Sequence, residues 1–287
     1  MEGSGWVSQS WMNEKADLIE LRKAYFTNNG MNERLFNSQY TNFVVMKHWI
    51  FYLVFLTQAI VVKSQDNHVL VELFTYDGCS NCASAGKNFK DFFPPGDSLL
   101  KVPVVLLTYH VDYDEHDGFQ DPFDDQRWKD RQKQYARFGI SDGIYTPQVI
   151  VNGRSAFSGS NRARVFREIN QADSIKIQPE YSLKFKIDSM STLIVKASTN
   201  EPLNNYILNY ALVKKIKISN PATGENAGRT MYSYNVVIDL LSILPGNKSP
   251  QKFNLPSNEK WEDYQFISFL QRIEDGQILS VRVNKLN

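Results

Sequence analysis

The feature that most constrains this fold is a Cys-x-x-Cys motif placed directly after a short apolar segment. Residues 68–75 read HVLVELFT, a run of β-branched and apolar residues typical of a buried strand. The turn-forming residues Tyr76-Asp77-Gly78 come next, and Cys79-Ser80-Asn81-Cys82 opens a segment with helical spacing. The chain contains just these two cysteines, which excludes a disulfide-rich secreted scaffold.

The segments after the motif predict the order strand, helix, strand, helix, strand, strand, helix. Strands are expected at residues 102–111, 148–152 and 156–157, and a helix at 126–138. Ser160 is expected to cap a last helix that carries Val165, Phe166 and Ile169 inward. A Cys-x-x-Cys at the first strand–helix junction of such a pattern is typical of a thioredoxin-like redox motif. We therefore expect an α/β, thioredoxin-like domain over residues 66–173.

From about residue 175 the pattern changes to alternating polar and apolar residues. Strands are expected at 181–187, 193–197, 206–218, 265–270 and 278–283, with a short helix at 235–241. Antiparallel pairs joined by polar turns favour a mostly β, sandwich-like domain over residues 175–287.

The two cysteines predict thiol chemistry with separate roles. Backbone N–H groups and the dipole at a helix start stabilise a thiolate, which is the nucleophilic form of cysteine. Cys79 is placed where this field acts, and it is the expected nucleophile. Cys82 lies one turn further into the helix and is the expected resolving thiol, which attacks the mixed disulfide.

Five positions outside the motif complete the predicted reaction site. Thioredoxin-like folds carry a cis-proline facing the Cys-x-x-Cys, and the Thr146-Pro147 pair before the third strand matches that position. Pro147 would leave the preceding backbone free to pair with an extended substrate peptide. Glu72, inside the first strand, would relay the proton of the resolving thiol, or it is a strand-end acid in water. Tyr76 and Tyr145 are expected to line the substrate cleft.

A run rich in histidine and acids, residues 110–119, leaves two interpretations open. His110 and Asp112 could line the Cys79 cleft, or the run is a solvated loop in which Asp112 caps a turn. A metal handler would use Cys79, Cys82 and His110, as in copper chaperones with a thioredoxin fold. No second Cys-x-x-Cys or paired-histidine motif completes a zinc site, and we expect no metal or cofactor.

The cysteine pair could instead form a stabilising disulfide. Closing a four-residue loop contributes only about 2 kcal/mol on chain-entropy estimates, which is a small stabilisation for a domain of this size.

Residues 224–230, GENAGRT, form a further polar segment. We expect this loop to dock on the thioredoxin-like domain through Asn226 and Arg229, or else to be a plain turn.

The apolar run at residues 49–62 follows Met46-Lys47-His48 and resembles a secretory signal peptide over 46–64. Val62 and Ser64 suit the −3 and −1 positions of a cleavage site. Residues 1–45 form a polar extension, and translation is expected to start at Met46. The alternatives are a cytoplasmic tail before an uncleaved anchor, and a buried helix.

The net charge of the chain argues against one class of partner, nucleic acids. The formal net charge of +1 is not the strong positive charge that is typical of nucleic-acid-binding proteins. Protein thiols and disulfides are the expected partners, and membrane contact is expected only through the signal segment. The oligomeric state stays open.

Several separated motifs occur in order: VELFTYDGCSNCASAGKNF, VVLLTYHVDYDEHDGFQDPF, FGISDGIYTPQVIVNGRSAFSGSNR and GENAGRTMYSYNVV. Over residues 68–287 the chain resembles the domain-of-unknown-function 1223 family. The resemblance implies a secreted or periplasmic bacterial protein with a thioredoxin-like fold. The expected function is that of an extracytoplasmic thiol–disulfide oxidoreductase-like protein. The alternatives are a redox-inert binding or adaptor module and a copper or metal handler, so whether the chain is an enzyme stays open.

Overall fold

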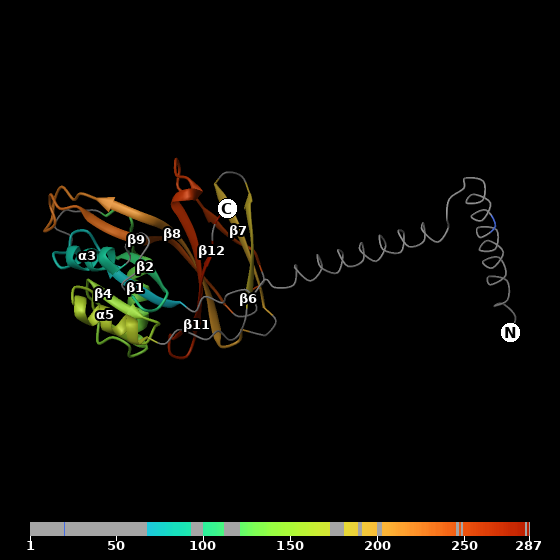
Figure 1. The fold of residues 1–287 in the computed structure, drawn as a ribbon, viewed down its shortest axis with the longest axis horizontal. Helices are drawn as coiled ribbons and strands as arrows, with labels where there is room; N and C mark the ends of the chain where they lie inside the picture. The colour runs from blue at the N-terminus through green and yellow to red at the C-terminus, as the bar shows by residue number, and fades with distance from the viewer. Residues whose placement is uncertain are drawn as a thin grey trace, which may run out of the picture. The chain divides into compact units, whose positions relative to one another are not determined.

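The computed structural model describes residues 20, 68–92, 100–111, 121–172, 181–188, 191–199, 203–244, 247, 249–284 and 286. The chain divides into two compact units, Met1–Ser64 and Gln65–Asn287, and every element below belongs to the second (Figure 1). The predicted signal segment lies outside the described residues, as does the polar extension apart from Glu20. Within the described part of the chain, no helix has the length and apolar character needed to cross a bilayer.

The first part of the second unit contains strands and helices in the predicted order, with one addition, the two-residue strand β3. These elements are β1 (Val69–Thr75), α3 (Cys82–Phe92), β2 (Val104–Val111), β3 (Asp124–Asp125), α4 (Gln126–Arg137), β4 (Gln148–Val151), β5 (Ser155–Ser158) and α5 (Arg162–Gln171). The remaining described chain is β-rich. It contains β6 (Tyr181–Asp188), β7 (Thr192–Thr199), β8 (Tyr206–Ser219), β9 (Met231–Ile243), β10 (Gln251–Asn254), a 3-10 turn η1 (Trp261–Asp263), β11 (Tyr264–Arg272) and β12 (Ile278–Asn284).

Nine of these strands form one mixed sheet. Its order is β12-β11-β8-β9-β2-β1-β4-β5, and β3 pairs with β2 beside this path. Strands β1 and β2 are parallel, as are β2 and β9, whereas β4 runs antiparallel to β1. A second sheet has the order β10-β7-β6.

This sheet shows that the predicted fold class is wrong. We expected an α/β, thioredoxin-like domain followed by a sandwich-like β domain, but strand residues far outnumber helical residues in the described part of the chain. Strands from both regions share the nine-stranded sheet, joined where β2 pairs with β9. The physical reason is that β2 would otherwise leave an unpaired edge, which a strand from later in the chain covers. Periodicity identifies a strand but not its partner.

The predicted helix at 235–241 is also wrong, because these residues belong to β9. β9 pairs along almost its whole length with β8, from Leu208↔Ile243 to Ser219↔Met231. A register shift at Leu212/Val213 marks an irregularity in this pairing, which disrupts the strict alternation that identifies a strand in a sequence. Pairing along β8 outweighs the weak local preference of the segment.

The apolar run of β1 is explained by burial on both faces of the sheet. Val69, Val71 and Leu73 join a core cluster with Ala85 and Phe89 of α3. The alternate residues, Leu70 and Phe74, pack on the other face with Tyr109, Trp128 and Tyr135. Helices α3 and α5 therefore cover one face, while α4 covers the opposite face.

Two details of helix α5 differ from the sequence prediction. Its N-cap is Asn161, whose side chain accepts from the backbone of Arg164, and not Ser160. Val165 and Ile169 are buried, but Phe166 is 37% exposed.

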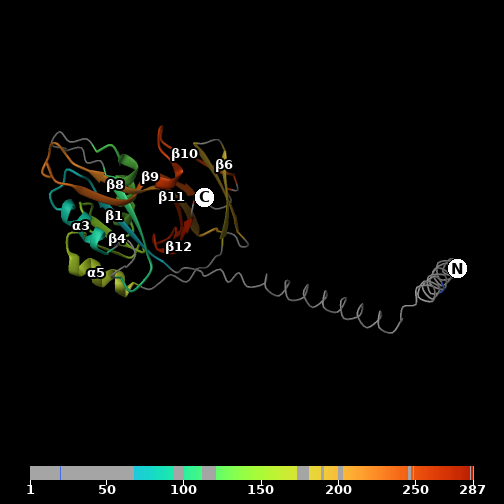
Figure 2. The same ribbon diagram turned by 45° about the horizontal axis from the view of Figure 1, so that its top comes forward.

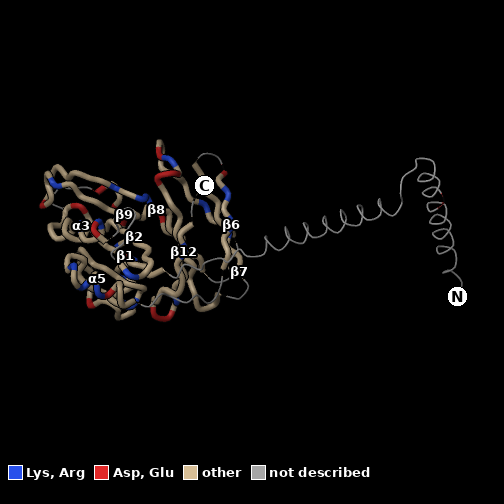
Figure 3. Tube along the Cα trace, in the orientation of Figure 1, with Lys and Arg blue, Asp and Glu red and all other residues tan. Residues whose placement is uncertain are grey.

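The second sheet packs against the far end of the large one. Leu193, Val195 and Phe253 form a core cluster with Tyr210 and Phe266. In both ribbon views, α3 and α5 lie at one end of this unit and β6 lies at the other (Figures 1 and 2). Acidic and basic residues are interspersed along the described trace (Figure 3).

Candidate functional site

The Cys-x-x-Cys motif lies at the carboxyl end of β1, between this strand and α3. Cys79 and Cys82 form a disulfide with a Cα–Cα distance of 5.3 Å. The Cys82 backbone N–H donates to the Cys79 carbonyl at 3.0 Å, and Cys82 is the first residue of α3. Cys79 is 8% exposed and Cys82 is 1% exposed, so Cys79 is the more accessible of the two.

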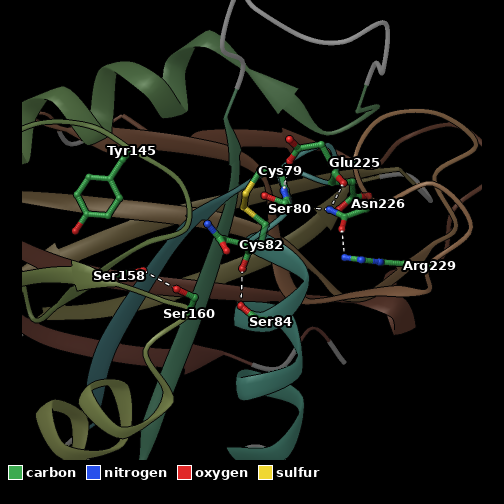
Figure 4. Close-up of a disulfide and its surroundings, with 12 residues drawn as sticks. Cys79, Ser80, Cys82, Ser84, Tyr145, Ser158, Ser160, Glu225, Asn226 and Arg229 are labelled. Carbon is green, nitrogen blue, oxygen red and sulfur yellow. Dashed lines mark hydrogen bonds between the residues drawn. A yellow bond between two sulfur atoms is a disulfide. The ribbon is translucent and has the colours of Figure 1, made fainter.

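The loop between β8 and β9 docks on this disulfide (Figure 4). The Asn226 side chain is fully buried, and its amide donates to the carbonyls of Asp77 at 2.8 Å and Cys79 at 2.7 Å. Arg229 donates to the Asn226 side-chain oxygen at 3.1 Å. The Ser80 backbone N–H donates to a Glu225 carboxylate oxygen at 2.8 Å. The structure thus brings Asn226 to the motif, and Arg229 supports Asn226. Glu225 was not singled out from the sequence.

The proline loop lies at the same end of the sheet. Gln148 pairs with Phe74 near the end of β1, and Thr146 and Pro147, joined by a cis peptide bond, come immediately before it. The Pro147 carbonyl accepts from Gly159, and a Cβ built on Gly159 would lie 3.3 Å from the Ala85 Cβ in the first turn of α3.

The predicted cleft residues are placed in different ways. Tyr76 is half-buried, and its ring lies over Gly78. Tyr145 is 40% exposed and separated from the sulfur atoms in Figure 4, while its carbonyl accepts from Gln132. Asp112 lies outside the described residues.

Glu72 is buried on the α4 face of the sheet, opposite α3. Its carboxylate contacts Arg131 Nε at 2.6 Å and accepts from the Tyr135 hydroxyl. Burial opposes the charge of Arg131, but the combined attraction of Glu72, Tyr109 and Tyr135, with the hydrogen bond to Glu72, outweighs the burial. The pKa of Arg131 therefore lies well above its usual value. Burial raises the pKa of Tyr135. The structure therefore places Glu72 in a buried ion pair, not on the α3 face.

A second buried charge cluster lies beside the disulfide loop, and we call Asp77, His110, Asp121 and Lys217 the lysine cluster. The Lys217 ammonium lies 2.9 Å from Asp77, 2.8 Å from Asp121 and 3.3 Å from His110 Nδ1. His110 Nδ1 also lies 2.5 Å from Asp121, and its Nε2 lies 3.2 Å from Ser233 Oγ. Each member of the cluster is at most 6% exposed.

The electrostatics of the lysine cluster favour a charged Asp121. Burial alone would raise the pKa of this carboxyl. The attraction and hydrogen bonds of His110 and Lys217 outweigh the burial, and they hold the pKa well below its usual value. Sequence reasoning singled out His110 but missed Lys217, which comes from β8.

Ligand atoms of Asp77, His110 and Asp121 lie within 4.8 Å of one another, a spacing that suits a metal ion. However, the Lys217 ammonium contacts all three side chains and supplies a positive charge of its own. A metal ion would have to displace this ammonium. The copper alternative gains no support either, because His110 is engaged at both ring nitrogens and the two sulfurs are bonded to each other.

The fold and site define a mostly β protein in which a Cys-x-x-Cys disulfide lies at the end of a mixed nine-stranded sheet, covered by a hairpin loop. The chain belongs to the family described as "Protein of unknown function (DUF1223)", whose model matches residues 70–271. No curated protein matches the chain.

Two solved structures match this chain, and the first of them shares its fold in part. The X-ray crystal structure of protein AGR_C_4864 from Agrobacterium tumefaciens is similar with a TM-score of 0.53 and 22% identity, covering 76% of this chain and 94% of that one. HBP35 of Porphyromonas gingivalis matches with a TM-score of 0.49 and 14% identity, covering 78% and 76%. At these identities the first of the two supports the fold alone.

Proposed function

We propose that this protein carries out thiol–disulfide exchange with other proteins through Cys79 and Cys82, outside the cytoplasm. The observation that carries the proposal is the disulfide itself, formed by two cysteines three residues apart at the start of a helix. A disulfide that closes so short a loop contributes little to the stability of the fold. Two sulfurs held at the start of a helix suit reversible exchange. Disulfides persist in oxidising compartments, which agrees with the signal-like segment of the sequence.

The proposed reaction moves two electrons between the cysteine pair and a partner. In the reducing direction, the Cys79 thiolate attacks a partner disulfide, which breaks and releases one partner thiolate. The Cys82 thiolate then attacks the Cys79 sulfur of the mixed disulfide. The second partner thiolate leaves, and the Cys79–Cys82 bond forms again. The same steps run in reverse when a partner dithiol is oxidised.

The surroundings of the motif support separate roles for the two sulfurs. Cys79 is the less buried residue and precedes the helix, and the first turn of α3 carries no acidic residue. We propose Cys79 as the attacking group and Cys82 as the resolving group. Thr146 and Pro147 come immediately before β4, beside the end of β1. We propose that the backbone of this segment pairs with an extended segment of the partner protein.

Redox titration of the purified protein tests the proposal. We expect a reversible transition of two thiols in glutathione buffers, with disulfide reductase activity abolished in Cys79→Ser. A Cys82→Ser variant should accumulate mixed disulfides with partner proteins. A native protein whose cysteine pair resists both oxidants and reductants while folded would contradict exchange, and would leave a binding module with a fixed cross-link.

A further inference from the structure

The Glu225 carboxylate occupies a backbone donor next to the more accessible cysteine. Ser80 follows Cys79 directly, and its N–H donates to Glu225 at 2.8 Å. Ser80 lies outside α3, which begins at Cys82, and its N–H is the backbone donor that directly follows Cys79. The β8–β9 loop therefore occupies this donor with a carboxylate and places a negative charge at the residue next to Cys79 (Figure 4).

The position of Glu225 is fixed by its buried neighbour. Asn226 is anchored by its hydrogen bonds to the carbonyls of Asp77 and Cys79. Within the loop, the Ala227 N–H donates to Gly224 and the Gly228 N–H donates to Pro221. Glu225 itself is exposed, so its charge is partly screened by solvent, but its place next to the motif does not depend on its own burial.

The other charges around the motif are engaged elsewhere. Asp77 and Lys217 form an ion pair inside the lysine cluster. Arg229 donates to Asn226, on the side of this amide away from the sulfurs in Figure 4. Glu225 is accordingly the carboxylate that the loop holds directly against the Ser80 backbone.

We infer that Glu225 is a tuning residue for the cysteine pair, opposing a thiolate at Cys79 and thereby favouring the disulfide state. This inference rests on the proposed function. When a dithiol reduces the pair, the Cys79–Cys82 bond breaks, the dithiol becomes a disulfide, Cys82 becomes a thiol, and Cys79 becomes a thiolate whose proton goes to solvent. The new negative charge then lies beside the Glu225 carboxylate and competes with it for the Ser80 N–H.

The substitution Glu225→Gln removes the charge but keeps the side-chain oxygen that accepts from Ser80. In reduced protein that also carries Cys82→Ser, which leaves one thiol, thiolate absorbance against pH gives the pKa of Cys79. We expect this pKa to fall by about half to one unit, which is about three- to tenfold more thiolate below the pKa. Glu225→Lys should lower it further, and high salt should shrink both differences. The matched control is Asp188→Asn on β6, an exposed carboxylate at the far end of the unit, with no expected change.

The outcomes separate this inference from the proposed function. If the native protein exchanges disulfides but the Cys79 pKa is the same in Glu225→Gln, the tuning role is wrong and the function stands. If the pKa falls but the native protein does not reduce partner disulfides, the tuning role stands and the function fails. A cysteine pair that cannot be reduced in the folded protein overturns both. Circular dichroism confirms that each variant is folded.

Discussion

At the scale of single residues, the most demanding feature is the lysine cluster. Two carboxylates, an imidazole and an ammonium are buried together, and such charges are tolerated only when they pair with one another. The Lys217 ammonium holds Asp77 and Asp121 at the same time. Because Asp77 also precedes Gly78 and Cys79, the cluster fixes the turn from which the cysteine loop starts.

Replacing Lys217 by Met should therefore destabilise the fold strongly. The change leaves two buried carboxylates without their cation, and we expect a loss of about 3–5 kcal/mol in the free energy of unfolding at neutral pH, measured with urea. Lys214→Met on the same strand is the control. Lys214 pairs with Glu259 at a partly exposed site, where the expected loss is under about 1 kcal/mol.

The stability loss in Lys217→Met should depend on pH in a defined direction. The pKa of Asp121 is lowered in the folded protein from its ordinary 3.8. Its contribution to stability is thus present above that value and is lost as the pH falls through the folded pKa. The stability difference between native protein and Lys217→Met should shrink as the pH drops below about 4. A difference that stays constant as the pH falls below this value would show that lost packing, not charge, is the cause.

At the scale of elements, helix α3 lies unusually close to strand β9. A Cβ built on Gly86 would lie 2.8 Å from the Tyr232 carbonyl oxygen, and the Lys90 ammonium lies 3.8 Å from the centre of the Tyr232 ring. A strand from late in the chain thus fixes the helix that carries Cys82. The absence of a side chain at Gly86 permits this approach.

The sign of the stability change in Gly86→Ala tests this close packing. In an exposed helix interior the change would stabilise by up to about 1 kcal/mol. Here the new methyl group meets a backbone oxygen that cannot move freely, and we expect a loss of about 1–2 kcal/mol in thermal or urea unfolding. Lys87→Ala, at an exposed position of the same helix, should be close to neutral. A stabilised Gly86→Ala variant would mean that α3 and β9 are further apart.

Local sequence patterns predicted most of the helices and strands, but few of the contacts that these elements make with distant parts of the chain. The strand predicted at residues 206–218 and the helix predicted at 126–138 correspond to β8 and α4. Lys217, in contrast, reaches Asp77 across 140 positions and Asp121 across 96, and its neighbours in β8 give no sign of either contact. Asn226 and Arg229 were found because two glycines marked their loop. Glu225, in the same loop, looked like an ordinary exposed acid.

At the scale of the whole molecule, the large sheet joins the two regions that the sequence seemed to separate. One core cluster draws Leu70 and Tyr109 from the first region and Val213, Phe269 and Val281 from the second. Neither region can bury these side chains alone. The described part of the second unit should behave as one cooperative body.

A fragment that ends at residue 173 tests this unity. It would lose β9, which pairs with β2, and much of the shared core. We therefore expect it to be insoluble or to lack fixed tertiary structure in near-ultraviolet circular dichroism. Residues 65–287 should unfold in a single transition seen equally by fluorescence and circular dichroism. Two separate transitions, or a well-folded fragment, would contradict a shared core.

The docking of Asn226 on Cys79 joins positions 147 residues apart. A chain in synthesis therefore contains the complete Cys-x-x-Cys motif long before it contains the amide that binds the Cys79 carbonyl. The contacts between the hairpin loop and the motif can form only after this later segment has been made.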